Sequence, residues 1–408
     1  MFEWSEEDLA MRIALRRFVE TEVRPRRKSL EYGDEPPYAL LRKMYEVFGL
    51  SDTARERFER TSQLNAQSTS TTKTVEEAET RAASGLIPLI ELSRCSPGMV
   101  TALGVSVGLT ASAILARGTD EQKRRWALDL LTMDKIGSWA ITEPGSGSDA
   151  FGSMYSTARR EGSGYVINGT KTFITNAPHA DLIVFICRLD DGGPSEGRPV
   201  VSFVLHGNEE GLERSQPLQK MGMHSSPTGE LFLTDVRVEK DQLIGETEPI
   251  RTGHAAVARD AAKATFARER ATISAIALGI IERCIELSTQ YANDRIQFGR
   301  PIGEYQLIQL KLAQMEVHRL NVEGLVFRHL SLAARKRSLS IEQASAMKLY
   351  AARAAVETAM EAVQLFGGNG YMAEFEVEQL ARDAKVLQIY GGTDEIQVTH
   401  IARGLLKK

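Results

Sequence analysis

The segment WAITEPGSGSDA, residues 139–150, combines residue types that could bind a flat polar ring or a phosphate. Two glycines bring backbone N–H groups close together, and hydroxyls come from Thr142, Ser146 and Ser148. The glycine spacing is similar to a dinucleotide fingerprint, but a third glycine is missing and the residues downstream have strand patterns, which excludes a Rossmann motif. The segment indicates a binding loop, with an ordinary Ser/Gly turn as the alternative.

Composition limits the kind of protein that carries this loop. A chain of 408 residues with 42% hydrophobic and 25% charged residues is expected to fold as two or three globular units. The net charge of -4 argues against nucleic acid as a partner. Three distant cysteines, Cys95, Cys187 and Cys284, suggest a reducing compartment and no metal site. The acidic start MFEWSEEDLA does not look like a signal peptide, so we expect a cytoplasmic location.

Hydrophobic periodicity divides the chain into three parts. Residues 1–135 have helical spacing, residues 136–250 contain short alternating runs typical of strands, and residues 251–408 return to long helical segments. The sequence therefore predicts an α+β multidomain protein with an N-terminal helical domain, a middle β-barrel or sandwich domain and a C-terminal four-helix bundle.

Three local features carry further predictions. Asn168-Gly169 lies between alternating runs and predicts a hairpin turn. The polar run 61–74 is expected to be a mobile loop, because it has almost nothing to bury. Residues 95–116 lack charge and could span a bilayer, but their proline, glycines and hydroxyls favour a buried core helix.

Six segments occur in order between about residue 85 and the end of the chain: WAITEPGSGSDA, KTFITNAPHAD, KMGMHSSPTGELFLTDVRV, DRIQFGRP, QLFGGNGY and RDAKVLQIYGGTDEIQ. Together they resemble the acyl-CoA dehydrogenase family. The resemblance implies FAD as cofactor, an acyl-CoA substrate that loses hydrogens from its α and β carbons, an electron-transferring flavoprotein as acceptor, and a homotetramer or homodimer. No nucleic acid, membrane or metal is implied.

The resemblance also assigns binding residues. It implies that the flavin ring is contacted by Trp139, Ile141, Thr142, Phe173 and Thr175. Phe173 replaces the usual Trp, which removes an indole N–H but keeps an aromatic face; a core strand residue is the alternative. Ser148 matches a CoA contact. The remaining FAD contacts implied, some of them to a neighbouring subunit, are Arg295, Gln297, Phe298, Gln306, Gln364, Gly368, Thr393 and Glu395.

The catalytic base is not where most family members carry it. Their turn reads Y-E-G-T, whereas this chain has Gly391 in the Glu position. Branches that resemble isovaleryl-CoA and long-chain acyl-CoA dehydrogenases supply the Glu from a bundle helix, and the matching residue in FARERATISAIALG is Glu269. We predict Glu269 as the base, Gly391 as the backbone N–H donor to the thioester oxygen, and Arg270 as a neighbouring site residue. A surface Glu in a charged helix is the alternative.

The chain also departs from the family pattern. The early P-E-x-Y-G-G stretch is missing, the linker 246–266 is long, and His224 stands where an Arg is common in the M-G-x-R-x-S run. Two other functions therefore stay open: a non-catalytic FAD- or CoA-binding subunit of a mixed oligomer, and an oxidase on the same fold.

Overall fold

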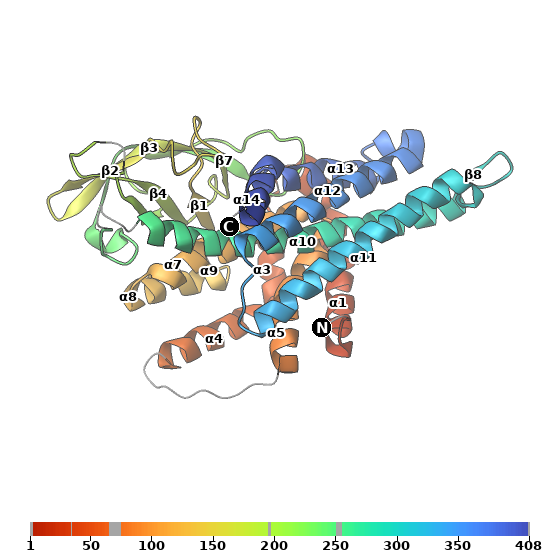
Figure 1. The fold of residues 1–408 in the computed structure, drawn as a ribbon, viewed down its shortest axis with the longest axis horizontal. Coiled ribbons are helices and arrows are strands. Elements are labelled where there is room, and N and C mark those ends of the chain that lie inside the picture. Colours follow the sequence, from red (N-terminus) through yellow and green to blue (C-terminus); the bar gives the residue numbers. More distant parts are fainter. Residues whose placement is uncertain (1–2, 34, 65–74, 195–196, 250–254, 407–408) are drawn as a thin grey trace.

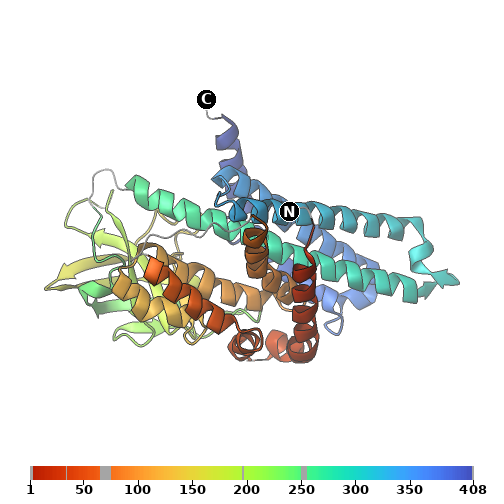
Figure 2. The ribbon, with the colours of Figure 1, turned by 90° about the horizontal axis from the view of Figure 1, so that it is seen from below.

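The computed structural model describes residues 3–33, 35–64, 75–194, 197–249 and 255–406. A β sheet lies at one end of the long axis and a small two-stranded hairpin at the other, with helices from both ends of the chain between them (Figures 1 and 2). The predicted order of a helical part, a β part and a helical bundle is confirmed.

The N-terminal helices begin with a well-capped first turn. Ser5 accepts a hydrogen bond from the Asp8 amide, and the Asp8 side chain accepts one from the Ser5 amide, which satisfies two otherwise unpaired helix donors. The predicted loop 61–74 is wrong for residues 61–64, which continue a helix, and residues 65–74 lie outside the described part. The helices are α1 (Glu6–Phe18), α2 (Arg27–Tyr32), α3 (Tyr38–Val47), α4 (Leu50–Leu64), α5 (Val75–Ser93), α6 (Pro97–Leu103), α7 (Ser112–Arg117), α8 (Asp120–Gln122) and α9 (Leu128–Leu131).

The apolar segment Pro97–Arg117 is a core helix of the kind predicted. Within the described ranges it is the one helical segment long and apolar enough to cross a membrane, and 56% of its most apolar window is buried. Leu109 and Ile114 are buried, and Ile114 belongs to the same cluster as Val184 of the sheet. This packing accounts for the apolar composition.

The middle part is one seven-stranded curled sheet. The strands are hydrogen-bonded in the order β1-β4-β2-β3-β7-β6, and β5 also pairs with β4. Strand β4 has three partners because β1 pairs with its first half and β2 with its last residues. β1 and β2 both run parallel to β4, while the remaining pairs are antiparallel. The strands are β1 (Gly137–Ala140), β2 (Thr157–Glu161), β3 (Gly164–Thr175), β4 (Leu182–Asp190), β5 (Val200–His206), β6 (Leu212–Arg214) and β7 (Thr228–Val238).

The hairpin predicted at Asn168-Gly169 is wrong, because both residues lie inside β3. The turn falls earlier, after Glu161, where Gly162 has φ +58. Asn168 instead exchanges hydrogen bonds with Asp235 of β7, and a Cβ on Gly169 would lie 2.2 Å from the Ser156 hydroxyl. The Asn-Gly pair therefore accommodates an irregular register and a close contact rather than a turn.

The C-terminal part is a bundle built on one long helix, α10, which carries the hairpin at its end. The predicted linker 246–266 is shorter than expected, since α10 begins at Ala255 and residues 250–254 are outside the described ranges. The elements are α10 (Ala255–Asp294), β8 (Ile296–Gln297), β9 (Arg300–Pro301), α11 (Gln306–Ala334), α12 (Ile341–Phe366), α13 (Glu376–Lys385) and α14 (Asp394–Leu406).

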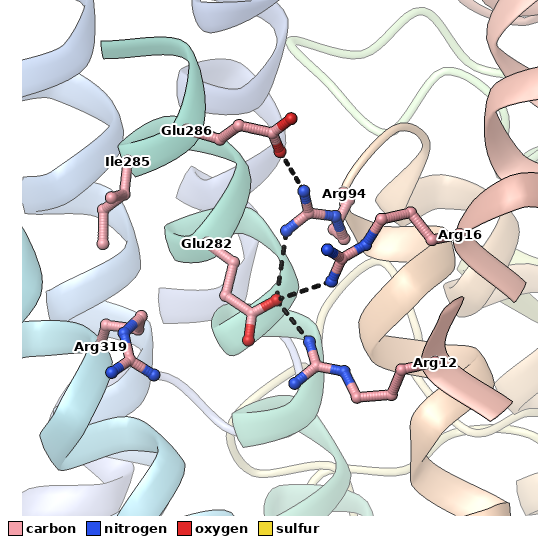
Figure 3. A pocket seen from close by; sticks show the side chains of 7 residues that line it. All are labelled: Arg12, Arg16, Arg94, Glu282, Ile285, Glu286 and Arg319. Carbon is pink, nitrogen blue, oxygen red and sulfur yellow. Dashed lines mark hydrogen bonds and ion pairs between the residues drawn. The ribbon is translucent and has the colours of Figure 1, made fainter. Parts of the chain in front are cut away.

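A cluster of ion pairs, which we call the arginine clamp, ties the N-terminal helices to α10 (Figure 3). Arg12 of α1 binds Glu91 of α5 at 2.7 Å and Glu282 of α10 at 2.5 Å. Arg94, just after α5, reaches Glu282 at 3.1 Å and also pairs with Glu286. Since Glu91 is fully buried, each of these charges depends on its partner.

The three cysteines, Cys95, Cys187 and Cys284, are all free thiols in the interior. Burial raises the pKa of each to about 12. They act as small apolar residues in the core.

Candidate active site

One edge of the sheet presents the residues expected to face a flavin ring. The Thr172 amide donates to the Thr142 carbonyl at 2.9 Å, and the Ser138 hydroxyl donates to the Thr175 carbonyl at 2.9 Å. These bonds join the end of β1 to the end of β3. They bring together five predicted residues, Trp139, Ile141, Thr142, Phe173 and Thr175.

An irregularity in β3 turns Phe173 outward. The register with β7 shifts between Lys171 and Ile174, and Phe173 has φ 57, a left-handed conformation that is costly for an aromatic residue. The side chain is 69% exposed as a result. A bulge of this kind re-aims a side chain next to a binding site. The alternative for Phe173, a core strand residue, is wrong.

This edge fits a flavin. An isoalloxazine needs an apolar face to lie against and donors for its polar rim. The exposed Phe173 ring supplies the face, and among the described residues the hydroxyls of Thr142 and Thr175 make no hydrogen bond that would compete. Ser148, the predicted CoA contact, is exposed on the neighbouring turn.

A buried ion pair that the sequence did not reveal fixes the turn after β1. Lys171 is fully buried and donates to Glu143 at 2.8 Å and to the Ile141 carbonyl at 3.1 Å. Glu143 also accepts from the Ser156 amide at 2.9 Å. Burial opposes ionisation of Glu143, but the bonds from Lys171 and Ser156 lower its pKa overall. The pair therefore holds the 141–156 turn in one shape.

The predicted base lies against the glycine turn. A Cβ built on Gly391 would lie 3.7 Å from the Glu269 carboxyl carbon and 3.8 Å from its Oε1. The Glu269 carboxylate thus borders the space that a side chain at position 391 would enter. Gly391 has φ +61, and the added Cβ would also meet Ile273 Cδ1 at 2.9 Å. Sequence reasoning paired these two residues, and the fold brings them together.

The Glu269 carboxylate is in an environment that favours proton uptake. Burial raises its pKa to about 7, against the opposing charges of Arg270 and Lys348. No hydrogen bond or ion pair to this carboxylate is found in the part of the chain that the structure describes. A partly buried carboxylate with a pKa near neutrality can accept a proton from a substrate at working pH.

Two side chains hold the turn that faces Glu269 through hydrogen bonds to its backbone. The Gly391 carbonyl accepts from Arg270 at 3.3 Å and from the buried Gln397 at 3.1 Å. Arg270 also donates to Ser345 of α12 at 3.0 Å. Gln397 was not predicted; its position in the D-E-I-Q run gave no indication that its amide would point back at the turn.

The start of α14 is held by a second set of charges. Asp394 is paired with the buried Lys348 at 3.3 Å and with Arg353 at 3.1 Å. Thr393 and Glu395, both predicted FAD contacts, flank it, and Glu395 is exposed. Both predicted residues therefore lie beside the turn at Tyr390 and Gly391 that faces Glu269, which we call the base turn.

The two halves of the site meet at α6. Asn176, which follows the flavin edge, donates to the Ala102 carbonyl at 2.9 Å. Thr101, which precedes Ala102 in α6, lies beside the hydroxyl of Tyr390. Burial raises the pKa of Tyr390 well above its usual value. Tyr390 precedes Gly391, so one helix separates the flavin edge from the base turn.

The remaining predicted FAD contacts lie elsewhere. Those on the hairpin and at the start of α11 are exposed at the far end of the molecule from the sheet, and the fold does not bring them to the flavin edge of the same chain (Figures 1 and 2). The Phe298 side chain is 95% exposed. Tyr291 of α10, near the hairpin, donates to the Phe366 carbonyl at 3.3 Å, which places the end of α12 nearby. The residues concerned are Arg295, Gln297, Phe298, Gln306, Gln364 and Gly368.

Comparison with known proteins accounts for this fold and site. Three family models match in order: the acyl-CoA dehydrogenase N-terminal domain over residues 5–134, the middle domain over 138–236 and the C-terminal domain over 259–406. An acyl-CoA dehydrogenase of Bacillus subtilis is 34% identical over 403 residues, 98% of each chain.

Solved structures of similar fold support the same family. Butyryl-CoA dehydrogenase from Megasphaera elsdenii superposes over 100% of both chains with a TM-score of 0.85 at 27% identity. A chain from the structural work on the electron-transferring flavoprotein of Acidaminococcus fermentans gives 0.85 at 28% identity, again over 100% of both chains.

The fold and site define a flavin-dependent oxidoreductase acting on CH–CH bonds. This chain belongs to the acyl-CoA dehydrogenase family, and its cofactor, as in other members, is FAD.

Proposed function

We propose that this chain removes hydrogens from the α and β carbons of an acyl-CoA thioester to give the trans-2-enoyl-CoA, with Glu269 as the base. The observation that carries this proposal is the Glu269 carboxylate beside Gly391, without a bonding partner in the described residues and with a pKa raised to about 7 by burial. Bound FAD would accept the hydride from the β carbon.

The residues of this chain divide the remaining work. Glu269 takes the α proton, and the Gly391 backbone N–H donates to the thioester oxygen, where negative charge develops. Arg270 and Gln397 hold the turn so that this donor stays in place. Phe173, Thr142 and Thr175 orient the flavin at the sheet edge.

We further propose that the chain works as a homotetramer in which the hairpin completes the FAD site of a neighbouring subunit. Arg295 and Phe298 are exposed far from the flavin edge of their own chain, and an Arg fork suits a pyrophosphate. Adjacent α11 exposes apolar side chains that a second copy could cover: Leu307, Leu310, Val317 and Leu320. An electron-transferring flavoprotein is the proposed acceptor, in keeping with the Acidaminococcus fermentans neighbour.

The function is tested by mixing the FAD-loaded protein anaerobically with a panel of acyl-CoAs of different length and branching. Bleaching of the flavin that persists until an electron-transferring flavoprotein is added supports the proposal. Absence of bleaching with every acyl-CoA would identify a non-catalytic subunit, and rapid recolouring in air would identify an oxidase.

A further inference from the structure

The turn at residues 141–156, between β1 and β2, begins with two adjacent peptide groups that are held differently. In the group that joins Thr142 to Glu143, both polar atoms are bonded: the carbonyl accepts from an amide of β3 at 2.9 Å, and the Glu143 amide donates to the Ser146 carbonyl at 3.2 Å. In the group that joins Ile141 to Thr142, the carbonyl accepts from Lys171 at 3.1 Å. The Thr142 amide has no acceptor among the residues that the structure describes.

The direction of this open amide follows from the shape of a trans peptide. The described parts of the chain contain no cis peptide bond, so the carbonyl and the N–H of the Ile141–Thr142 group point in opposite directions. The carbonyl points at Lys171 Nζ, which is fully buried, and the Thr142 N–H therefore points away from the buried lysine. Thr142 is partly exposed, and its own carbonyl is bonded to the residue that precedes the exposed Phe173. The open amide thus lies at the flavin edge.

Lys171 is placed to fix this peptide group. Its ammonium donates to Glu143 at 2.8 Å as well as to the Ile141 carbonyl, and Nζ lies 5.1 Å from the centre of the Phe185 ring in the interior of the sheet. Glu143 also accepts from two backbone amides at the end of the turn, at 2.5 Å and 2.9 Å. The two side chains are 0% and 4% exposed. The pair therefore acts on a ligand only through the backbone that it holds.

The bond from Lys171 also makes the open amide a better donor. A carbonyl that accepts from a cation draws electron density from the nitrogen of its own planar peptide group, so the hydrogen bonds on the two sides of the peptide strengthen one another. Glu143 balances the charge of Lys171. The pair therefore polarises one peptide group without adding a net charge to the site.

A flavin ring has a use for such a donor. The ring takes up a hydride, which is two electrons and one proton, and the electron density on its polar rim then rises. A hydrogen bond to that rim is stronger for the reduced ring than for the oxidised ring, because hydrogen bonds to a charged acceptor are the stronger ones. A well-aimed donor therefore raises the reduction potential of the ring.

We propose that Lys171 and Glu143 are positioning residues that aim the Thr142 amide at the polar rim of bound FAD and so raise its reduction potential. This role rests on the flavin edge of the proposed function and not on the acyl-CoA chemistry. The buried pair is a device of the sheet alone, since both partners and the peptide group lie between β1 and the end of β3.

A double variant separates this role from a change of charge. Lys171→Met together with Glu143→Gln removes both buried charges, so no unpaired charge remains in the sheet and the net charge is unchanged. Lys171→Met alone leaves Glu143 without its counter-charge and is the stronger perturbation. Glu91→Gln, in the arginine clamp and away from the sheet, is the control for lowered stability alone.

Each protein is loaded with FAD and studied without substrate. The reduction potential is measured by equilibrium titration against a reference dye, the dissociation constant of oxidised FAD by fluorescence, and stability by the thermal midpoint. The carbonyl stretching frequencies of the flavin in the infrared spectrum report the hydrogen bond directly, since loss of a donor raises them.

We expect the double variant to bind reduced FAD about tenfold less tightly relative to oxidised FAD, which lowers the potential by about 30 mV. A flavin carbonyl frequency should rise in the same variant. Lys171→Met alone should lower the potential further, because the unpaired Glu143 charge opposes reduction. Glu91→Gln should lower the midpoint and keep the wild-type potential.

A double variant with the potential and carbonyl frequencies of the wild type would overturn the proposal and leave the pair with a structural role only. Flavin carbonyl frequencies in the wild type that match those of a flavin in an aprotic solvent would overturn it as well, and this reading needs no variant to fold. Failure of every acyl-CoA to bleach the flavin would instead refute the proposed function, since the potential and the spectrum are read without turnover.

Discussion

Glu91 and Glu269 lie on packed neighbouring helices, α5 and α10, yet their surroundings are opposite. Glu91 is completely buried in the arginine clamp and bonded to Arg12 at 2.7 Å and Arg16 at 3.0 Å. Glu269 has no such partner among the described residues and faces a glycine. Burial is thus common to structural and catalytic carboxylates, and the absence of bonded donors is what leaves a carboxylate free to take a proton.

The largest effect should come from removing the carboxylate that lacks a bonded partner. Glu269→Gln keeps size and polarity but cannot accept the α proton, so turnover should fall roughly 10²-fold or more while FAD stays bound. Stopped-flow bleaching and the flavin spectrum measure the two quantities. Full turnover in this variant would remove Glu269 from the mechanism, and with it the contrast to Glu91.

The next largest effect is expected from pH. The base works when ionised, and its pKa is raised to about 7, so kcat/KM should fall on the acid side of that value. In the limit the loss is about tenfold per pH unit. A profile that stays flat from pH 5 to pH 8 would show that burial does not govern this carboxylate.

A smaller loss of turnover is expected from a side chain in the glycine turn. Gly391→Ala places a Cβ at 2.9 Å from Ile273 Cδ1 and at a φ of +61 that favours glycine. The turn must shift, and we expect turnover to fall about threefold to tenfold, with a stability cost of about 1 kcal/mol. Adding Ile273→Val should restore part of the loss, because it removes the contacting methyl group; no recovery would assign the loss to the backbone alone.

Removal of the paired carboxylate of Glu91 should lower stability and leave turnover unchanged. Glu91→Gln removes the buried carboxylate that pairs with both Arg12 and Arg16 and leaves Arg12 with Glu282 alone. We expect a cost of about 3 kcal/mol or more. The thermal midpoint should drop by several degrees, whereas turnover per bound FAD should match the wild type. Glu286→Gln, in the same clamp but with its side chain 51% exposed, is the matched control and should cost about 1 kcal/mol or less.

Sequence reasoning recovered the order of the three parts and the Glu269–Gly391 pairing, because these rest on long periodic segments and linear motifs. It failed at Asn168-Gly169, where contacts with Asp235 and Ser156 outweighed the local preference for a turn. It also gave no indication of the pairs Lys171–Glu143 or Arg94–Glu282. Such partners are far apart along the chain, so only the folded backbone shows which charges meet.

His224 shows the same limit of sequence reasoning. The sequence identified it as a departure from the family pattern, but the two carbonyl oxygens at its ring come from Glu31 and Lys220. One of them is on α2, in a different part of the fold. A motif can therefore indicate that a position is unusual, while its consequence depends on long-range neighbours.

The three interior thiols have a practical consequence for attaching a label at a chosen position. With their pKa values near 12, Cys95, Cys187 and Cys284 are almost entirely in the unreactive thiol form at neutral pH. The native chain should therefore react only very slowly with maleimide reagents. A single cysteine introduced at exposed Met221 would then carry a fluorophore or spin label against a low background, without replacement of the three natural cysteines.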